Sequence, residues 1–317
     1  MNQFKNNQEK NSLSSQNENM EELDDLYKPK LNEKGDYVIR CSKIKYEPYG
    51  DFFIKLTNKI TLFRAQTFLT QEPTTLEWLQ QFKKESWLLD IGSNIGIYSI
   101  PSALFHASKV ISVEVEPSNY VELLKNIKIN KISPERIEPL LLGISTKYAN
   151  KLNKLYLTND EIGESCHQLG DNRDFMLNQV DISRSYKTAY SISLTQLIQA
   201  SSVPSNVPLH IKIDVDGIEH DICECLFTSN LINRISSIQV ELNPINIPEH
   251  ENLKNNFLKN NFTYSEDQVE RMREKEGIFK NFSNYIFIPK YVPNFGGKDP
   301  SKEINKQHLI LKKYYNL

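Results

Sequence analysis

The sequence of 317 residues lacks the features that place a protein in a membrane or in an oxidising compartment. Its four cysteines show neither a Cys-x-x-Cys pair nor a disulfide framework, so we expect reduced thiols. No apolar run approaches the roughly 20 residues that span a bilayer, and no apolar segment follows the lysines near the N-terminus. A formal net charge of −2 provides no general attraction to nucleic acid or to an anionic membrane. We therefore expect a cytoplasmic protein with no membrane span and no nucleic-acid partner.

Composition divides the chain into four segments. The first is rich in Asn, Gln, Glu, Lys and Ser, with too few apolar residues to offset the entropy of ordering. The next segments alternate apolar runs and helical spacing, and the last is again polar. The expected segments, in chain order, are a disordered tail over 1–30, an N-terminal cap with a lead-in helix over 31–85, a single main domain over 86–292 and a C-terminal tail over 293–317, which contains a possible helix.

The expected cap consists of short strands followed by one helix. Apolar runs predict strands over 52–56 and 60–63, joined by a turn. Thr74 and Glu77 have the spacing of a capping box just after Pro73, which predicts that a helix leads into the main domain.

The main domain alternates strand patterns with helix patterns, which predicts a mostly parallel sheet with helices on both faces. The expected strands are 87–91, 109–115, 137–142, 209–215, 236–241 and 284–289. The expected helices are 97–107, 118–130, 193–200, 218–228 and 251–260. Pro101 should bend the first of these helices unless it lies in the first turn. Residues 146–192 are polar and longer than an ordinary connection, so we expect them to shape a substrate pocket or to pack as a β-arm.

The first candidate site is the turn that follows residues 87–91. The apolar run stops at Asp90, and the chain turns through Gly92 and Gly96, where glycine permits positive φ and the close approach of a ligand. The spacing Gly-x-x-x-Gly differs from the dinucleotide-binding pattern, and a P-loop lysine is lacking. A purely structural turn would explain the glycines but not the neighbouring Asp90 and Asn94. The stretch therefore predicts a strand end that holds a nucleotide.

The second candidate is Glu116, which follows the next expected strand. It lies about twenty residues beyond the glycine turn, the offset at which an acid accepts both hydroxyls of a ribose. The alternative is a solvated glutamate at a strand end. Pro117 and the helical spacing after it favour the binding role.

The third candidate is the strand end at Asp214. Gly217 permits a sharp turn, and Glu219 and His220 lie in the first turn of the following helix. Acids in a first turn also suit the helix dipole, so Glu219 has a structural alternative. Because ligands of open α/β sheets collect at the carboxyl ends of the strands, Asp214 should meet the first two candidates in one crevice. Glu241 ends a further strand at the same edge.

Four stretches in this order, DIGSNIGIYSI, VEPSNYVELLKNIKIN, HIKIDVDGIEH and SIQVELN, resemble the FkbM-type family of S-adenosylmethionine-dependent methyltransferases. The resemblance covers roughly residues 70 to 290. It implies an α/β fold of class I methyltransferase type, a Rossmann-like and mostly parallel sheet with a reversed C-terminal strand. The chain departs from the family at Ser93, where Ala is usual, and at Thr195, where Asp is frequent; the role of that acid stays open.

The resemblance also implies the cofactor S-adenosylmethionine and its contacts. It places Asp90, Gly92, Asn94 and Gly96 at the methionine end. It places Glu116 at the ribose, and Leu142 and Gly143 at the adenine. The implied reaction is O-methylation of a sugar, a glycan precursor or a natural product.

The hydroxyl proton of the acceptor then needs a base. Asp214 or Glu219 is the expected base, with His220 as an alternative. A second possibility is that Asp214 and Glu241 hold a divalent cation that lowers the pKa of the hydroxyl. Other functions remain open: N-methylation on the same fold, a catalytically silent cofactor-binding module and, less favoured by the glycine spacing, a nicotinamide dehydrogenase. The sequence leaves the oligomeric state open.

Overall fold

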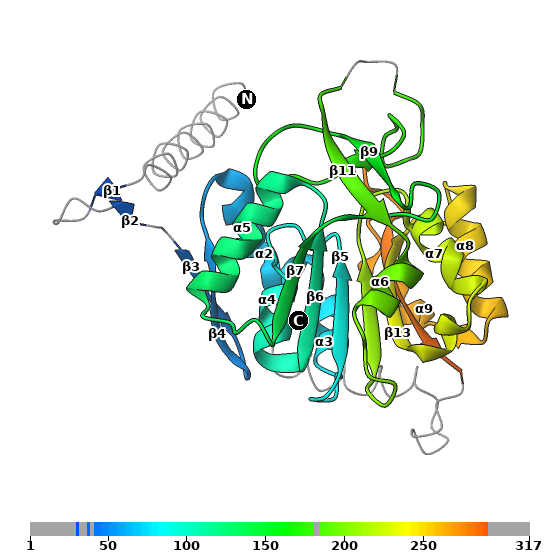
Figure 1. Cartoon of the computed structure of the whole chain (residues 1–317), viewed down its shortest axis with the longest axis horizontal. Coiled ribbons are helices and arrows are strands. Elements are labelled where there is room, and N and C mark those ends of the chain that lie inside the picture. The colour runs from blue at the N-terminus through cyan, green and yellow to red at the C-terminus, as the bar shows by residue number, and fades with distance from the viewer. Residues whose placement is uncertain (1–29, 32–36, 39–40, 181–183, 291–317) are drawn as a thin grey trace, which may run out of the picture.

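A seven-stranded sheet forms the centre of the molecule. The computed structural model describes residues 30–31, 37–38, 41–180 and 184–290. The strands of the sheet are β5 (Trp87–Ile91), β6 (Lys109–Glu114), β7 (Ile137–Leu141), β12 (Leu209–Ile213), β13 (Ile235–Leu242), β14 (Phe262–Thr263) and β15 (Ser283–Pro289). Their order is β14-β15-β13-β12-β5-β6-β7 (Figure 1).

One strand of this sheet runs against its main direction. The strands β5, β6, β7, β12 and β13 pair in parallel. In contrast, β15 pairs antiparallel with both β13 and β14. This order, with its single reversed strand near the C-terminal edge, is the class I methyltransferase fold. The fold expected from the sequence is therefore confirmed.

Helices cover both faces because successive strand residues point to opposite sides. The described helices are α2 (Lys59–Gln71), α3 (Pro73–Leu79), α4 (Ser99–Pro101), α5 (Pro117–Ile129), α6 (Leu194–Ala200), α7 (Glu219–Phe227), α8 (Pro248–Lys259) and α9 (Glu266–Met272) (Figure 1). Leu89 and Ile111 belong to a core cluster with α6, α7 and α8, whereas Leu88 and Val110 pack in a second cluster with α2, α3 and α4. A 3₁₀ turn, Asn230–Arg234, precedes β13. Within the described ranges no helix has the length and apolar character needed to cross a bilayer.

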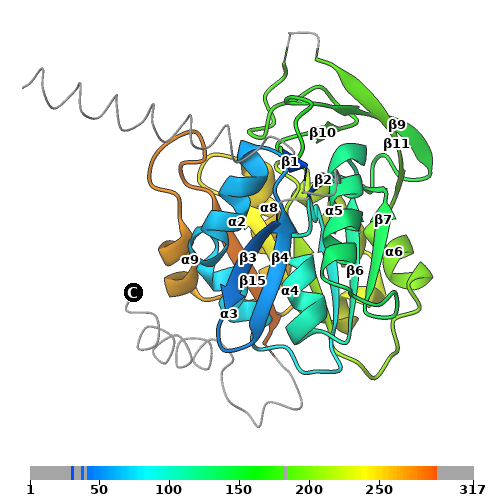
Figure 2. The same ribbon diagram turned by 90° about the vertical axis from the view of Figure 1, so that its left-hand side faces the viewer.

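An N-terminal hairpin packs beside α5. Its strands are β3 (Cys41–Tyr46) and β4 (Gly50–Lys55), and Figure 2 shows them on the outside of the helical layer. Asn126 Oδ1 on α5 accepts the Lys55 N–H at 2.8 Å, and Asn130 exchanges hydrogen bonds with the backbone of Phe53. A separate pair, β1 (Lys30–Leu31) and β2 (Tyr37–Val38), precedes the hairpin.

The strand expected over 60–63 is wrong, because these residues belong to α2. Asn58 accepts the N–H of Thr61 while the Thr61 side chain accepts the N–H of Asn58, which completes a capping box. The helix expected after Pro73 is confirmed as α3. Its N-cap residue is Glu72, whose carboxylate accepts the Thr75 hydroxyl at 2.7 Å, so the capping box expected from Thr74 does not form.

The helix expected over 97–107 changes type at its proline. The α-helical turn α4 ends at Pro101, and residues Ser102–His106 form a π-helical turn. The Ala107 N–H donates to the Ser102 carbonyl at 2.9 Å. Proline has no N–H to donate, which favours such a local change in the hydrogen-bond ladder.

The long insertion forms a β-arm, as one of the two expectations proposed. Its strands are β8 (Gly143–Ile144), β9 (Lys151–Tyr156), β10 (Gln168–Leu169) and β11 (Tyr186–Ile192). They form a sheet with the order β10-β9-β11-β8. The arm stands beyond the carboxyl ends of the parallel strands (Figures 1 and 2). The disorder expected for the N-terminal tail and the helix expected in the C-terminal tail concern residues 1–29 and 293–317, which lie outside the described residues.

Candidate active site

The loop after β5 is fixed between the ends of β6 and β12. Gly92 has a φ of +83°, and a Cβ at this position would overlap the carbonyl oxygen of Asp214. The N–H groups of Gly92 and Ser93 both donate to the Val113 carbonyl, at 2.9 and 3.0 Å. Only glycine combines this dihedral angle with such a close approach. The first and third sequence motifs therefore meet through the backbone at Gly92.

Asn94 and Gly96 have different roles in the same loop. The Asn94 N–H donates to Glu114 Oε2 at 2.7 Å, and its side-chain amide donates to the Glu164 carbonyl at 2.8 Å. Gly96 has a φ of +87°, and a Cβ there would stand 2.6 Å from the Leu123 side chain. Asn94 lines the cavity described below, whereas Gly96 allows the loop to pack on α5.

Two glutamates at the end of β6 have different surroundings. Glu114, 5% exposed, accepts hydrogen bonds from the N–H groups of Asn94 and Glu116, each at 2.7 Å. Burial raises the pKa of Glu114 to about 7, although these two hydrogen bonds act in the opposite direction. Glu116 accepts the Asn119 N–H at 2.7 Å as the N-cap of α5 and pairs with Lys187 at 2.5 Å. Because the strand ends at Glu114, this residue lines the cavity and Glu116 does not.

The end of β7 also reaches the cavity. Leu142 and Gly143, which the family resemblance implies at the adenine, both line the cavity. The Leu142 N–H donates to the Glu114 carbonyl at 3.0 Å. A Cβ at Gly143 would stand 2.5 Å from Ser191 Oγ and 2.9 Å from the Leu169 side chain, so this glycine lets the β-arm pack closely on the sheet.

The turn after β12 carries two aspartates into the cavity. The Asp214 N–H donates to the Ile91 carbonyl at 3.0 Å, and Asp214 Oδ2 lies 2.5 Å from Lys212 Nζ. Asp216 has a φ of +60°, and its Oδ2 accepts the Cys166 N–H at 2.9 Å. Both carboxylates line the cavity.

Glu219 and His220, the other expected proton acceptors, do not line the cavity. Glu219 is 1% exposed, and its carboxylate accepts the N–H groups of Val215 at 3.3 Å and of Gly217 at 3.0 Å. Burial lowers the pKa of His220, and its Nδ1 has no hydrogen-bond partner in the part of the chain that is described. Glu219 thus holds the turn that carries the aspartates, rather than facing a ligand.

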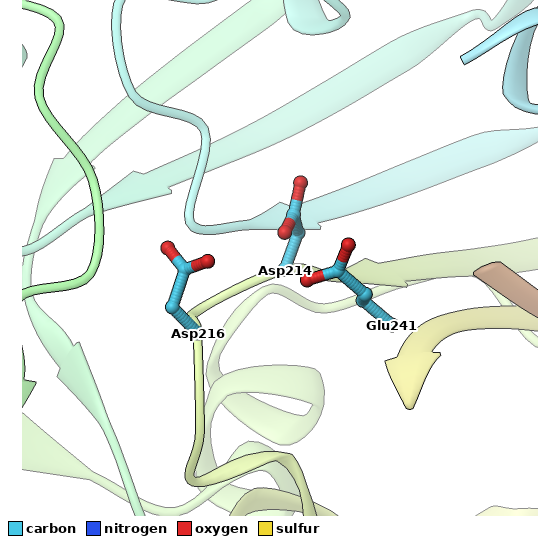
Figure 3. Close-up of side chains that lie close together, drawn as sticks. All are labelled: Asp214, Asp216 and Glu241. Carbon is cyan, nitrogen blue, oxygen red and sulfur yellow. The ribbon is translucent and has the colours of Figure 1, made fainter. Parts of the chain in front are cut away.

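Three carboxylates form a cluster at the ends of β12 and β13. One oxygen from each of Asp214, Asp216 and Glu241 lies within 4.8 Å of the other two (Figure 3). Burial, followed by the charge of Asp214, raises the pKa of Asp216 to about 7. Burial and the charges of both aspartates raise the pKa of Glu241 well above its usual value. The sequence predicted that Asp214 and Glu241 lie at the same edge of the sheet. It did not predict Asp216 as a site residue, although Asp216 follows Asp214 by two residues.

Lys212 is a buried cation that the sequence analysis missed. It is 1% exposed, and its Nζ lies 5.0 Å from the centre of the Tyr98 ring. Burial acts to lower the pKa of Lys212, but the charges of Asp214, Glu72 and Asp90 outweigh this effect and raise it. A lysine inside the apolar run of β12 indicates a buried partner of opposite charge, because lysine is almost never fully buried without one.

Asp90 lies behind the glycine loop. The Ser99 hydroxyl donates to Asp90 Oδ2 at 2.5 Å, while Oδ1 is buried and has no hydrogen-bond partner among the described residues. Burial raises the pKa of Asp90, and the charge of Lys212 opposes this. Asp90 lines a small recess beside the main cavity, together with Gly92 and Asn94.

These residues surround a cavity of about 370 Å³ at the carboxyl ends of β5, β6, β12 and β13. Its apolar lining includes Val115, Leu142, Ile144, Leu155 and Leu169. The acidic side chains that line it are Glu72, Glu114, Glu164, Asp214, Asp216, Glu241 and Glu274. Among the described lining residues, the basic side chains are Arg64 and His167, and burial lowers the pKa of His167.

The cavity is covered by α2 and by the loop 161–166 of the β-arm. Ile60, Phe63, Arg64 and Gln71 on α2 face the cavity. Asn58 Nδ2 donates to the Ile162 carbonyl at 2.8 Å. Neither α2 nor its lining residues were predicted from the sequence, which placed a strand here.

The sequence matches no family model and no curated protein. This chain matches solved structures, three of them with the following extent of similarity. The tRNA m1G37 methyltransferase of M. jannaschii is 12% identical with a TM-score of 0.37, over 81% of this chain and 60% of that one. M. jannaschii TYW2, in complex with AdoMet, is 15% identical with a TM-score of 0.38, over 81% and 90% of the two chains. Precorrin-6y C5,15-methyltransferase of Geobacter metallireducens is 9% identical with a TM-score of 0.35, over 69% and 87%.

Proposed function

We propose that the chain is an S-adenosylmethionine-dependent methyltransferase of the FkbM-type family that methylates a hydroxyl of a sugar, a glycan precursor or a natural product. The observation that carries this proposal is the convergence of the Gly92 loop, Glu114 and Asp214 on one cavity. Ligands of open α/β sheets bind at this edge. The four ordered sequence motifs support the family, and the strand order supports the fold.

The residues present fit an adenosyl cofactor. Gly92 leaves open the space that a Cβ would occupy. Asp90 Oδ1, which has no hydrogen-bond partner among the described residues, offers an acceptor for an ammonium group. Glu114 keeps lone pairs on both oxygens for two vicinal hydroxyls, so we assign it to the ribose in place of Glu116. The apolar side chains around Leu142 suit the adenine ring. A cavity of about 370 Å³ is in the range of small-molecule sites.

The chain's own residues must align the acceptor and take its proton. S-adenosylmethionine, when bound, supplies a methyl group already activated by the sulfonium charge. Asp214 is held through Oδ2 by Lys212, and its Oδ1 makes no hydrogen bond with any described residue, so it can orient the acceptor hydroxyl. Asp216, with a pKa of about 7, is matched to accept a proton near neutral pH. The expected base was Asp214 or Glu219, with His220 as an alternative, and we propose Asp214 and Asp216 together for this role.

The same carboxylates support a second version of the reaction. Asp214, Asp216 and Glu241 offer the oxygen ligands that Mg²⁺ and Ca²⁺ prefer. A cation there would lower the pKa of the acceptor hydroxyl and relieve the repulsion among the three side chains. Turnover that persists in a strong chelator would support the metal-free version. Turnover that is lost and then restored by added Mg²⁺ would support the cation.

The charge of the cavity bears on the acceptor. Carboxylates dominate its lining, and like charges in a partly buried site repel strongly. This favours a neutral or cationic acceptor over a polyanion such as nucleic acid. A cationic amine would also suit the site, so N-methylation is the second candidate. The position of the product methyl group, determined by NMR, distinguishes oxygen from nitrogen.

The test combines binding with transfer. S-adenosylhomocysteine is titrated by calorimetry, and labelled S-adenosylmethionine is incubated with fractionated extracts containing sugars and small natural products. We expect binding and a labelled O-methyl product. Asp216→Asn should lower turnover at least about tenfold while retaining cofactor binding, whereas Asp171→Asn, at a partly exposed aspartate paired with Lys147, should change neither. Absence of binding would refute the proposal, and binding without transfer to any fraction would support a silent module.

A further inference from the structure

Arg64 extends from α2 toward the recess beside the glycine loop. Ile60, Phe63, Arg64 and Gln71 share one helical face, and all four line the main cavity. Arg64 also lines the small recess with Gly92, Asn94 and Asp214. Its Nε donates to the Gly163 carbonyl at 2.7 Å, which fixes the guanidinium group at this place.

Most donors of Arg64 have no acceptor among the residues that the structure describes. A guanidinium group has five N–H donors in a rigid fork, and the Gly163 carbonyl uses one of them. The two terminal nitrogens form neither a hydrogen bond nor an ion pair with any residue in 41–180 or 184–290. The charge of Arg64 nevertheless acts inside the cavity. Burial raises the pKa of Asp216, and the charge of Arg64 acts to lower it. A fixed fork with free donors is the geometry that binds a carboxylate through two hydrogen bonds.

The other basic side chains near the cavity are not available for an anion. Lys212 is fully buried and bonded to Asp214 at 2.5 Å. His167 accepts the Thr158 N–H at 3.2 Å, and burial lowers its pKa, so its ring is neutral at pH 7. Among the described lining residues, Arg64 is therefore the positively charged side chain that still has N–H groups available to donate hydrogen bonds.

The amino-acid end of an adenosyl cofactor carries one carboxylate, which is its only anionic group. In a cavity lined by acids this group would be repelled unless a cation met it. We infer that Arg64 binds this carboxylate and so sets the position of the methionine end beside the Gly92 loop. The inference rests on the proposed function. It adds a residue from α2, outside the four motifs, to the cofactor site.

Two ligands that differ only in the carboxylate test this role. S-adenosylhomocysteine carries it, and S-adenosyl-3-thiopropylamine is the same molecule without it. Calorimetric affinities are measured for the wild type, for Arg64→Gln and for the control Arg234→Gln. Arg234 bonds the carbonyls of Ser205 and Pro204 at the opposite end of the sheet.

We expect Arg64→Gln to weaken S-adenosylhomocysteine binding by about 10- to 100-fold, the usual effect of a lost charge-assisted contact. The same change should leave the affinity for S-adenosyl-3-thiopropylamine within about twofold, and Arg234→Gln should alter neither. An equal loss of affinity for both ligands would show that Arg64 only holds α2 and the loop 161–166 in place over the cavity. An unchanged affinity for S-adenosylhomocysteine would also overturn the inference. If the wild type bound neither ligand, the proposed function itself would fail.

Discussion

Gly92 and Asp214 are in backbone contact, although 121 positions separate the two in the sequence. The α-carbon of Gly92 faces the Asp214 carbonyl so closely that a methyl group has no room. The Asp214 N–H in turn donates to the carbonyl of Ile91, the residue before the glycine. The loop that is proposed to hold the cofactor and the turn that carries the proposed base are therefore one rigid unit.

Gly92→Ala should destabilise the fold and impair ligand binding together. The left-handed φ costs about 1 kcal/mol or more for alanine, and the overlap with the Asp214 carbonyl adds to it. We expect a loss of about 2–4 kcal/mol in urea unfolding. Gly277→Ala is the matched control, because Gly277 has a φ of +75° and no described residue lies within 4 Å of the added methyl group. Equal losses in the two variants would show that the contact with Asp214 has no energetic consequence.

Glu114 should make stability fall as the pH rises toward neutrality. Its pKa in the folded chain is about 7, above the 4.5 of an unperturbed glutamate. Between these values the folded chain holds a proton that the unfolded chain has lost, so stability is highest below about pH 4.5 for this group and declines up to about pH 7. The effect is about 3 kcal/mol. Urea unfolding at pH 5 and pH 8 should show a smaller pH difference in Glu114→Gln than in the wild type, and identical differences would contradict the assignment.

Glu114 rather than Glu116 should determine ribose binding. We expect Glu114→Gln to weaken S-adenosylhomocysteine about tenfold or more, because a carboxylate that accepts two hydroxyls is lost. Glu116→Gln should have a small effect on affinity, since Glu116 caps α5 and pairs with Lys187 away from the cavity. Calorimetry of both variants decides between the residues, and the reverse ranking would restore the assignment made from the sequence.

Lys212 should be coupled energetically to Asp214. Lys212→Met leaves the neighbouring carboxylates without their buried cation, and we expect a loss of about 3–5 kcal/mol. Adding Asp214→Asn removes one of these carboxylates, so the double variant should be less destabilised than the sum of the two single changes. Urea unfolding of the four proteins measures the coupling. Strict additivity would mean that the contact at 2.5 Å contributes no interaction energy.

Glu219 should act on the fold more than on the chemical step. Glu219→Gln replaces an acceptor-only group that binds the N–H groups of Val215 and Gly217, so we expect a loss of about 1–2 kcal/mol in thermal unfolding. Glu224→Gln, on the exposed side of the same helix, is the control. A collapse of turnover with unchanged unfolding would instead establish Glu219 as a base.

The sheet was predictable because its signals are local. Each central strand is an apolar run bounded by polar or turn residues, and five of the parallel strands were placed to within two residues of their observed ends. The glycine turn was also predictable from the sequence, because a positive φ at Gly92 is a local backbone requirement that glycine meets. Residues 60–63 of α2 were misassigned as a strand because the capping by Asn58 outweighs the strand pattern of the apolar residues that follow.

The sequence by itself determined the α/β class, the order along the chain of the motifs that follow the strands, and the acidic residues at the strand ends. Only the tertiary structure decided which of those acids face the cavity. Glu114 and Glu116 look equivalent along the chain, but one ends a strand and the other caps a helix. Lys212, Asp216 and Arg64 join the site through contacts with distant segments, and such contacts are set by packing in space, which no local pattern encodes.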